Sequence, residues 1–282
     1  MVLSAGHGTR LRPLSSFLAK PMVPLGDRPA IAHIVERVRA CVPARIVVNV
    51  HYRPDDVRVW ASAEGVLVSE EEELLGTAGG VEHANHLLGD ADVLVWNGDI
   101  VSDLDSRALV RAHETRRADA TLAVRSRPRG EGNVGMNADG RIVRLRAESF
   151  GEEVSGGDFV GVHVVGHALR TALPKEGCLV GDVYIPLLAG GGTLAAFVVD
   201  GEFHDIGTIA SYLAANRAWL RSRDHEAWTA DGALVRAEVR GSIIGARARV
   251  EAPATNSVVW PDTHVTEAID GAVATPHGIV RP

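Results

Sequence analysis

The feature that most limits the fold is an alternation of apolar runs with helix-patterned segments through the first two-thirds of the chain. The runs are rich in Val, Ile and Leu, as buried strands are. Strands are therefore expected at 1–4, 46–50, 93–96, 121–124, 159–165 and 194–199. Helices are expected from Pro29 onward and at 81–88, 106–117 and 209–220. This order predicts an α/β fold with a Rossmann-like, mostly parallel sheet flanked by helices.

The C-terminal part of the chain repeats with a period of 15 residues. Segments of similar pattern begin at Ser242, Ser257 and Ala272, and each places apolar residues before small residues and turns. A fixed period of this kind predicts stacked β coils, with chance hairpin strands as the alternative. We therefore expect a Rossmann-like domain over 1–221 and a short left-handed β-helix-like tail over 232–282.

Charge and composition exclude several classes of protein. The formal net charge of −7 disfavours a general nucleic-acid binder, although a few local cations suffice to bind an anionic substrate. The two cysteines, Cys41 and Cys178, show neither a disulfide framework nor metal-ligand spacing. No apolar stretch approaches the roughly 20 residues that span a bilayer, and no signal-peptide pattern is present. We expect a cytoplasmic protein that binds neither nucleic acid nor membrane.

A glycine loop that carries two arginines follows the first apolar run. It reads Ala5-Gly6-His7-Gly8-Thr9-Arg10-Leu11-Arg12-Pro13. Glycines of this kind let backbone N–H groups approach phosphate oxygens without a Cβ in the way. The dinucleotide fingerprint of an NAD-dependent oxidoreductase fails, because Leu11 stands where a third glycine is required. The Walker A pattern fails for want of Gly-Lys-Ser/Thr. The sequence predicts a phosphate-binding loop of neither class.

A second segment, Lys20-Pro21-Met22-Val23-Pro24-Leu25, follows the loop, and the pair resembles the signature of the sugar-1-phosphate nucleotidylyltransferases, also called NDP-sugar pyrophosphorylases. Further segments occur in the family's order. They are Leu75-Gly76-Thr77-Ala78-Gly79, Asn97-Gly98-Asp99, Phe159-Val160-Gly161-Val162-His163 and His204-Asp205-Ile206-Gly207-Thr208. The resemblance implies an enzyme that joins a nucleoside triphosphate to a sugar 1-phosphate and releases pyrophosphate. On this basis residues 1–221 would form the catalytic domain.

The resemblance also implies roles for individual residues. Arg10 and Lys20 would be catalytic, holding the triphosphate and the reacting phosphates. Asp99 and Asp205 would hold Mg²⁺, which prefers a few carboxylates together with water and phosphate oxygens. Asp103 and Asp105 are nearby competitors for the metal, and Asp205 has the alternative role of a helix N-cap. The nucleotide would contact Ala5, Gly6, Gly8, Thr9, Arg10, Gly76, Thr77, Ala78 and Gly79.

The sugar-binding half resembles the family least. Many relatives carry a Glu-Lys-Pro segment whose lysine contacts the sugar phosphate, and here the region reads Val143-Arg144-Leu145-Arg146-Ala147-Glu148-Ser149. Either Arg144 or Arg146 is expected to supply the cation, although a guanidinium and an ammonium are not interchangeable. The predicted sugar-binding residues are Gly135, Arg146, Asp158 and Gly161. We expect His163 to pack or hydrogen-bond on its strand rather than contact the substrate.

The identity of the substrates is the least constrained part of the prediction. The segment 75–79 looks most like that of mannose-1-phosphate guanylyltransferases, which favours GTP with mannose 1-phosphate or a related sugar. A uridylyl- or thymidylyltransferase of another sugar 1-phosphate stays open. A catalytically silent regulatory subunit that binds NDP-sugar is also open, although Arg10, Lys20, Asp99 and Asp205 favour the enzyme. Because exposed coil edges accept a partner strand, a homo-oligomer is expected.

Overall fold

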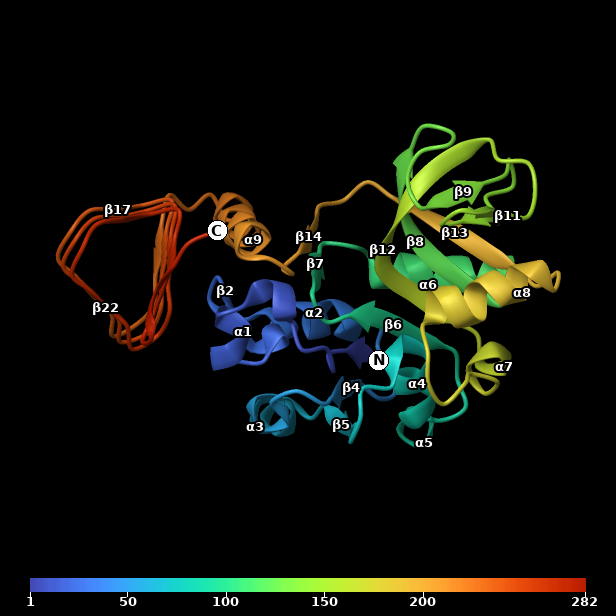
Figure 1. Cartoon of the computed structure of the whole chain (residues 1–282), viewed down its shortest axis with the longest axis horizontal. Helices are drawn as coiled ribbons and strands as arrows, with labels where there is room; N and C mark the ends of the chain where they lie inside the picture. The colour runs from blue at the N-terminus through green and yellow to red at the C-terminus, as the bar shows by residue number, and fades with distance from the viewer. The chain divides into compact units, whose positions relative to one another are not determined.

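The computed structural model describes residues 1–282, and the chain divides into two units. The first unit holds residues 1–6 and 34–203, and the second holds residues 7–33 and 204–282. Figure 1 draws the chain as a ribbon, coloured from the N-terminus to the C-terminus. The division that the sequence predicts, between a catalytic domain of 1–221 and a tail of 232–282, stays a prediction. No helix is long and apolar enough to span a membrane.

A ten-stranded mixed sheet forms the centre of the first unit. Its order is β11-β10-β9-β12-β6-β1-β4-β5, with β8 paired to β12 and β13 paired to β8. The strands are β1 (Val2–Leu3), β4 (Val47–Val50), β5 (Leu67–Glu70), β6 (Val93–Asn97), β8 (Ala120–Arg127), β9 (Val134–Met136), β10 (Ile142–Leu145), β11 (Glu148–Ser149), β12 (Ser155–Val165) and β13 (Leu194–Val199). Neighbours among β6, β1, β4 and β5 pair in parallel, so their carboxyl ends share one edge of the sheet. Strand β12 runs antiparallel between β6 and β8.

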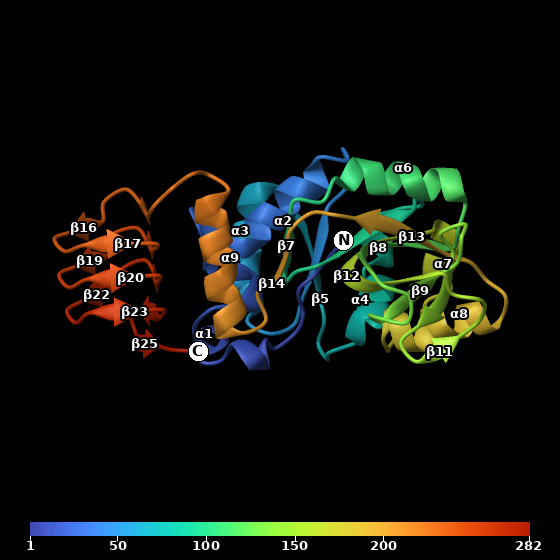
Figure 2. The ribbon, with the colours of Figure 1, turned by 90° about the horizontal axis from the view of Figure 1, so that it is seen from above.

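Helices cover both faces of this sheet, which is why its central strands are continuous apolar runs. Figure 2 shows α6 on one side of the sheet and α4 and α8 on the other. The helices of this part of the chain are α2 (Ala30–Arg39), α3 (Pro54–Glu64), α4 (Gly76–His83), α5 (Asn85–Leu88), α6 (Ser106–Arg116), α7 (His167–Arg170), α8 (Ile185–Ala189) and the π-helical turn η3 (Leu179–Tyr184). The predicted Rossmann-like α/β fold is confirmed.

The segment expected to be a base-binding loop is instead the first turn of helix α4. Glycines are poor helix formers, and the sequence therefore indicates a loop. Close packing outweighs this preference, because a Cβ at Gly80 would lie 2.7 Å from Asn49 Nδ2 and from Glu71 Oε1. The single helix expected over 81–88 is likewise divided, since α4 ends before Ala84 and α5 begins after it.

The second unit contains four stacked coils with three sides, whose triangular outline is visible in Figure 1. The strands are β15 (Trp228–Thr229), β18 (Ile243–Ile244), β21 (Val258–Val259) and β24 (Val273–Thr275) on one side, β16 (Leu234–Val235), β19 (Arg249–Val250) and β22 (His264–Val265) on the next, and β17 (Val239–Arg240), β20 (Ala254–Thr255) and β23 (Ile269–Asp270) on the third. Ile243 pairs with Val258 and Val258 with Val273, so the period of 15 is the pairing register. The β-helix-like tail is confirmed, and the left-handed sense of its coils stays a prediction.

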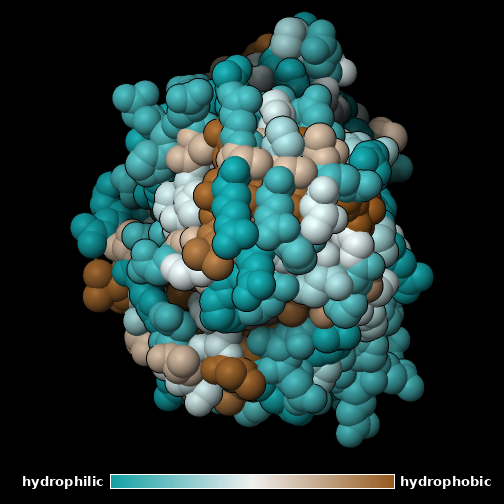
Figure 3. Space-filling model, turned by 90° about the vertical axis from the view of Figure 1, so that its left-hand side faces the viewer, coloured by the Kyte–Doolittle hydropathy of each residue, from teal (hydrophilic) through white to brown (hydrophobic).

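The first coil begins at Trp228, one coil earlier than the repeats visible in the sequence. In this coil Leu234 and Val235 are 52% and 40% exposed. Burial therefore does not require apolar residues at these positions, as it does in the later coils, and the repeat is not visible in the sequence of the first coil. At the other end, β25 (Gly278–Val280) pairs antiparallel with β24. The molecular face drawn in Figure 3 is mostly hydrophilic, with small separated hydrophobic areas.

The rest of the second unit is built from short elements around one long helix. These are η1 (Thr9–Leu11), α1 (Leu14–Phe17), η2 (Lys20–Met22), β2 (Pro24–Leu25), β3 (Arg28–Pro29), the end of β14 (Phe203–Asp205) and α9 (Ile209–Arg221). Helix α9 begins with a capping box in which the Thr208 side chain accepts a hydrogen bond from Ser211 N. The N-cap is therefore Thr208, and the alternative role of Asp205 as the cap is wrong.

The interior of the coils gives a matched test of the repeat. Val250 and Val235 occupy paired positions in neighbouring coils, but Val250 is 0% exposed and Val235 is 40% exposed. We expect Val250→Ala to lower the free energy of unfolding by about 1.5–3 kcal/mol, because it removes buried methyl groups and leaves a cavity. Val235→Ala should cost less than about 0.5 kcal/mol. Urea unfolding followed by tryptophan fluorescence measures both, and equal losses would contradict the packing described.

Candidate active site

The glycine loop of the second unit packs against the segment that carries Lys20. Gly8 has φ +60°, a left-handed conformation that favours glycine. A Cβ there would lie 3.1 Å from Lys20 Cβ and 3.2 Å from Ser15 Cβ. The Ser15 hydroxyl donates to Gly8 O at 2.7 Å, and Leu11 N donates to the same carbonyl at 3.0 Å. The loop therefore has one compact shape, with Arg10 on the turn that follows.

Three of the predicted site residues lie together in the second unit. Asp205 Oδ2 is 3.8 Å from Arg10 Nη2, and Asp205 Oδ1 is 3.9 Å from Lys20 Nζ. Both separations exceed a charge-assisted hydrogen bond, so these are ion pairs held by charge. Gly207 keeps the cluster open, because a Cβ there would lie 2.6 Å from Asp205 Oδ1. One carboxylate thus has a cation near each of its oxygens.

The two cations of this cluster differ in exposure. The Arg10 side chain is 66% exposed and the Lys20 side chain is 12% exposed. Lys20 and Lys175 are the only lysines among the 29 basic Lys and Arg residues of the chain. A compact ammonium suits a confined position better than a guanidinium fork does. Of the two lysines, Lys20 is the confined one, because Lys175 is exposed.

The segment that carries Lys20 continues into the hairpin of β2 and β3, and helix α9 holds this hairpin. The Tyr212 hydroxyl donates to Pro24 O, and Gly26 N donates to Asn216 Oδ1 at 3.0 Å. Gly26 has φ +61°, and a Cβ there would lie 2.1 Å from the Trp219 ring. The tail also helps to hold the hairpin, because Trp260 Nε1 donates to the Tyr212 hydroxyl at 3.2 Å.

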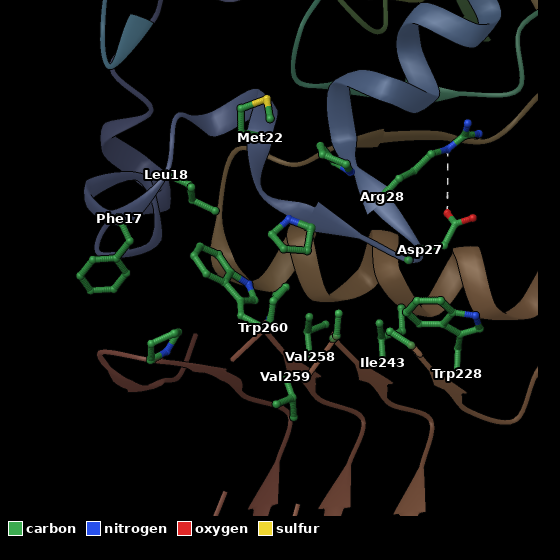
Figure 4. A pocket seen from close by; sticks show the side chains of 18 of the residues that line it. Phe17, Leu18, Met22, Asp27, Arg28, Trp228, Ile243, Val258, Val259 and Trp260 are labelled. Carbon is green, nitrogen blue, oxygen red and sulfur yellow. Dashed lines mark ion pairs between the residues drawn. The ribbon is translucent and has the colours of Figure 1, made fainter. Parts of the chain in front are cut away.

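A cavity of about 440 Å³ lies beside this hairpin within the second unit. Figure 4 shows apolar side chains from the loop segment on one wall and from the coils on the other. They include Phe17, Leu18, Met22, Trp228, Ile243, Val258, Val259 and Trp260. The ion pair between Asp27 Oδ1 and Arg28 Nε, 3.9 Å apart, is also drawn there. None of the predicted site residues lines this cavity.

In the first unit, a buried polar network fixes the start of helix α4. Ser4 N donates to Asn49 Oδ1 at 2.7 Å, Asn49 Nδ2 donates to Glu71 Oε1 at 2.6 Å, and Leu75 N donates to Glu71 Oε2 at 3.1 Å. Glu71 is 3% exposed and Asn49 is 3% exposed. Sequence reasoning missed both residues, although a polar residue inside the apolar run 46–50 was the available signal.

The predicted nucleotide-binding turn makes several bonds within the chain. Ala78 N donates to Gly177 O at 2.8 Å, Gly177 N donates to Leu75 O at 2.9 Å, and Leu179 N donates to Thr77 Oγ1 at 2.8 Å. The N–H of Ala78 is thus engaged within the chain, and the contact of residues 76–79 with a nucleotide stays a prediction.

Asp99 lies in a tight turn between β6 and β7 (Ile100–Ser102) of the first unit. Gly98 makes this turn possible, because a Cβ there would lie 2.2 Å from Ser4 Oγ. Of the competitors for metal binding, Asp105 caps helix α6 by accepting from Arg107 N and Ala108 N. Asp103 lies close to Gly201, where a Cβ would come within 2.2 Å of its Oδ1. Asp99 directly follows β6, at the carboxyl end of that strand.

A second cavity, of about 280 Å³, lies within the first unit. It is lined by Leu3, Thr77, Asn97, Asn133, Leu145, Arg146, Phe159, His163, Cys178, Leu179 and Val180. Arg146 contributes the basic side chain of this lining, and its Nη2 lies 3.6 Å from Cys178 Sγ. Arg144 points elsewhere, because its guanidinium donates to Glu153 at 2.6 and 3.1 Å. Of the two arginines left open by the sequence, Arg146 is the one at a cavity.

The other predicted sugar-binding residues differ in how near they lie to this cavity. Gly161 has φ +78°, and a Cβ there would lie 2.7 Å from the amide nitrogen of Asn97, which lines the cavity. Gly135 packs against Glu153 and does not line the cavity. Asp158 also lies outside the lining, because Arg127 and Arg125 hold its carboxylate at 2.7 and 3.2 Å. The hydrogen bond from Arg127 is the main cause that lowers the pKa of Asp158.

His163 packs on its strand, which is the first of the two alternatives that the sequence predicts. It packs on strand β12 but finds no hydrogen bond there, because both ring nitrogens are buried without a partner. Its ring is 2% exposed and meets the Tyr184 ring edge-on at 5.7 Å and the Phe159 ring at 5.3 Å. Burial lowers the pKa of His163 to about 3, so the imidazole is neutral at physiological pH.

The residues present fit a magnesium ion by their chemistry. No group of three or more His, Cys, Asp or Glu side chains surrounds a common point. Magnesium does not require such a group, because it keeps several waters and takes phosphate oxygens beside one or two carboxylates. Asp99 of the first unit and Asp205 of the second each offer one carboxylate of this kind.

Residues 1–222 match the Nucleotidyl transferase family, NTP_transferase, and the chain belongs to this family.

Comparison with curated proteins finds mannose-1-phosphate guanylyltransferases. Those of Aspergillus fumigatus, Yarrowia lipolytica and Mycobacterium tuberculosis are 30%, 28% and 29% identical over 79%, 79% and 78% of this chain. The chain spans about 64% of the length of each of them. Among solved structures, HddC from Yersinia pseudotuberculosis, complexed with GMP-PN, shares the fold with a TM-score of 0.64. It is 22% identical, with 77% of this chain and 97% of that chain covered.

The neutral His163 predicts a pH effect on stability. Its pKa is lower in the folded state than in the unfolded chain, so protons bind the unfolded state as the pH falls below about 6.5. Between pH 7 and pH 5 the wild type should lose about 2 kcal/mol more than His163→Phe, which cannot take up this proton. Urea unfolding at both pH values measures the difference. Parallel losses in the two proteins would contradict the buried neutral imidazole.

Proposed function

We propose that the chain catalyses Mg²⁺-dependent transfer of a nucleotidyl group from GTP to mannose 1-phosphate or a closely related sugar 1-phosphate. The products are an NDP-sugar and pyrophosphate. The observation that carries the proposal is the cluster of Arg10, Lys20 and Asp205, which joins residues nearly 200 positions apart in sequence around one carboxylate. Membership of the Nucleotidyl transferase family and the names of the curated relatives support it.

The proposed chemistry needs charge and position more than covalent work from the protein. A phosphate oxygen of the sugar phosphate attacks the α-phosphorus in line, a P–O bond forms, and the bond to pyrophosphate breaks. The exposed guanidinium of Arg10 suits the leaving pyrophosphate, where the negative charge accumulates. The confined ammonium of Lys20 suits the reacting phosphates, because a cation fixed before reaction stabilises charge without reorganisation.

Magnesium would take its protein ligands from Asp99 and Asp205. When bound, it supplies neutralisation of the phosphate charges that otherwise repel the incoming sugar phosphate. The chain's own part is to hold each carboxylate in place. The Gly98 turn does this for Asp99, and the ion pairs with Arg10 and Lys20 do it for Asp205.

The remaining contacts of the nucleotide and the sugar are proposed to come from the glycine loop, the start of helix α4 and the cavity of the first unit. Ala5, Gly6, Gly8 and Thr9 are proposed to hold the phosphates, and Gly76, Thr77 and Gly79 the base. In the sugar cavity, Arg146 takes the place of the lysine that many relatives carry, and Gly161 leaves room for Asn97. Gly135 and Asp158 stay predicted sugar-binding residues, although neither lines this cavity.

Two further proposals concern the protein as a whole. The catalytic segment is proposed to be 1–221 and the repeat tail 232–282, in a cytoplasmic protein. The tail is proposed to support a homo-oligomer, because Leu234 and Val235 leave apolar side chains exposed on the first coil.

Pyrophosphate release from a matrix of nucleoside triphosphates and sugar 1-phosphates with Mg²⁺ tests the proposal. We expect release only when both substrates are present, fastest with GTP and mannose 1-phosphate, and reduced at least about a hundredfold in Asp99→Asn. Faster release with UTP or dTTP and another sugar 1-phosphate would assign different substrates to the same reaction. Binding of NDP-sugar without release from any pair would leave a regulatory subunit as the better account.

The two lysines give a matched pair of variants. Lys20→Met should lower kcat/KM at least about a hundredfold, because it removes a fixed cation from the reacting phosphates. Lys175→Met removes the same charge from an exposed position and should leave kcat/KM within about twofold of wild type. Steady-state kinetics with both substrates varied measures this. Equal kcat/KM values in the two variants would show that Lys20 takes no part in the reaction.

A further inference from the structure

A chain of two hydrogen bonds leads from the repeat tail to the segment that carries Lys20. Trp260 Nε1 donates to the Tyr212 hydroxyl at 3.2 Å, and the Tyr212 hydroxyl donates to Pro24 O. The direction of both bonds is fixed, because an indole N–H can only donate and a proline carbonyl can only accept. Burial raises the pKa of Tyr212, so its hydroxyl keeps the proton that this arrangement requires.

The groups in this chain are shielded from water. Trp260 is 3% exposed and Tyr212 is 0% exposed. A buried polar group that loses its partner has no water to bond to instead, so the paired arrangement is strongly favoured. The two bonds also strengthen one another, because a hydroxyl that accepts a hydrogen bond becomes a better donor. The position of the Tyr212 hydroxyl therefore depends on Trp260.

Packing alone leaves the Trp260 ring incompletely held. The ring lines the cavity of about 440 Å³ beside the hairpin, as Figure 4 shows. A side chain beside a cavity lacks van der Waals contacts on that side, because the empty space supplies no atoms. The hydrogen bond to Tyr212 thus helps to set the orientation of the ring, and the ring in turn sets the hydroxyl.

The far end of the chain lies close to Lys20 in sequence. Pro24 follows Lys20 by four residues, and Val23 N donates to Lys20 O at 3.4 Å. Proline has a fixed φ, so a segment that contains Pro21 and Pro24 has little freedom to bend. A shift of the Pro24 carbonyl is therefore passed on to Lys20. Such shifts matter for catalysis, because a misplacement of about 1 Å can lower a rate about a hundredfold.

We propose that Trp260 is a positioning residue, which holds Lys20 in place for nucleotidyl transfer through the Tyr212 hydroxyl and the Pro24 carbonyl. The inference rests on the proposed function and makes the repeat tail a part of the catalytic apparatus. Trp260 lies outside residues 1–222, which match the family, so its role comes from the contacts of this chain alone.

The test compares variants that break the chain of hydrogen bonds at different points. Trp260→Phe removes the indole N–H and keeps an aromatic ring. In steady-state kinetics with GTP, mannose 1-phosphate and Mg²⁺, its kcat should fall about fivefold to tenfold, because Lys20 no longer meets the reacting phosphates in one fixed position. The KM values of both substrates should stay within about twofold of wild type, as for an interaction that acts in the transition state.

Tyr212→Phe breaks the same chain at its centre, so its kcat should fall by a similar factor. The double variant of Trp260 and Tyr212 should lose no more than Tyr212→Phe alone, because the two changes remove one connected interaction. Tyr212→Phe loses only an oxygen atom, and it provides the test if Trp260→Phe does not fold. Thermal unfolding checks that each variant is folded at the temperature of the assay.

Trp228 gives a matched control, because it lines the same cavity and its indole is not part of this chain of bonds. Trp228→Phe makes the same change of side chain and should leave kcat within about twofold of wild type.

A cycle with Lys20 separates positioning from a general disturbance of the site. In Lys20→Met the cation is already absent, so adding Trp260→Phe should lower kcat by less than about twofold. A general disturbance would instead lower kcat by the same factor in both backgrounds.

The outcomes are distinct. Turnover by wild type, with kcat unchanged in Trp260→Phe or lowered equally in Trp228→Phe, would overturn the inference and leave the proposed function standing. An equal effect of Trp260→Phe in the wild-type and Lys20→Met backgrounds would do the same. No turnover of any sugar 1-phosphate by wild type would overturn both.

Discussion

The proposed role of Lys20 requires a fixed position, although Lys20 lies on a single 3-10 turn outside the main sheet. The surrounding packing supplies the rigidity that the segment lacks. Gly26 approaches the Trp219 ring closely enough to exclude any side chain, and the Tyr212 hydroxyl donates to the carbonyl of Pro24. Trp260 of the tail donates to that same hydroxyl. This explains why residues 7–33 belong to one unit with residues 204–282, far away in the sequence.

A comparable constraint operates in the first unit, where the glycine-containing start of helix α4 has little preference of its own for a helix. Burying Glu71 is costly unless its oxygens are hydrogen-bonded, and Asn49 and the backbone of Leu75 provide these bonds. Asn49 is in turn fixed by Ser4 N, at the end of the first strand. The network thus ties strand β1 to the turn proposed to bind the base.

Features with a strong local pattern could be predicted from the sequence. Strand β13 covers the expected residues, helix α9 differs from expectation by one residue at its end, and the period of 15 is the pairing register of the coils. In each case burial of one face imposes the pattern directly. The first coil could not be predicted, because Leu234 and Val235 are largely exposed and burial does not fix its pattern.

Features that depend on distant partners could not be predicted. Whether Arg144 or Arg146 reaches a cavity depends on Glu153, which pairs with Arg144. The start of α4 depends on Asn49 and Glu71, and the missing partner of His163 is visible only from its surroundings. Conversely, the motif resemblance located Arg10, Lys20 and Asp205, which the structure brings together. The resemblance carries information about distant contacts that local patterns lack.

In the proposed reaction the sugar phosphate attacks the α-phosphorus of the triphosphate. The most direct test of this step uses mannose 1-phosphate with ¹⁸O in the non-bridging phosphate oxygens, incubated with GTP, Mg²⁺ and the protein. Mass spectrometry of the products then locates the label. Attack at the α-phosphorus leaves all of the label in the NDP-sugar and none in pyrophosphate. Label in pyrophosphate or in inorganic phosphate, or GTP consumed without NDP-sugar, would contradict it.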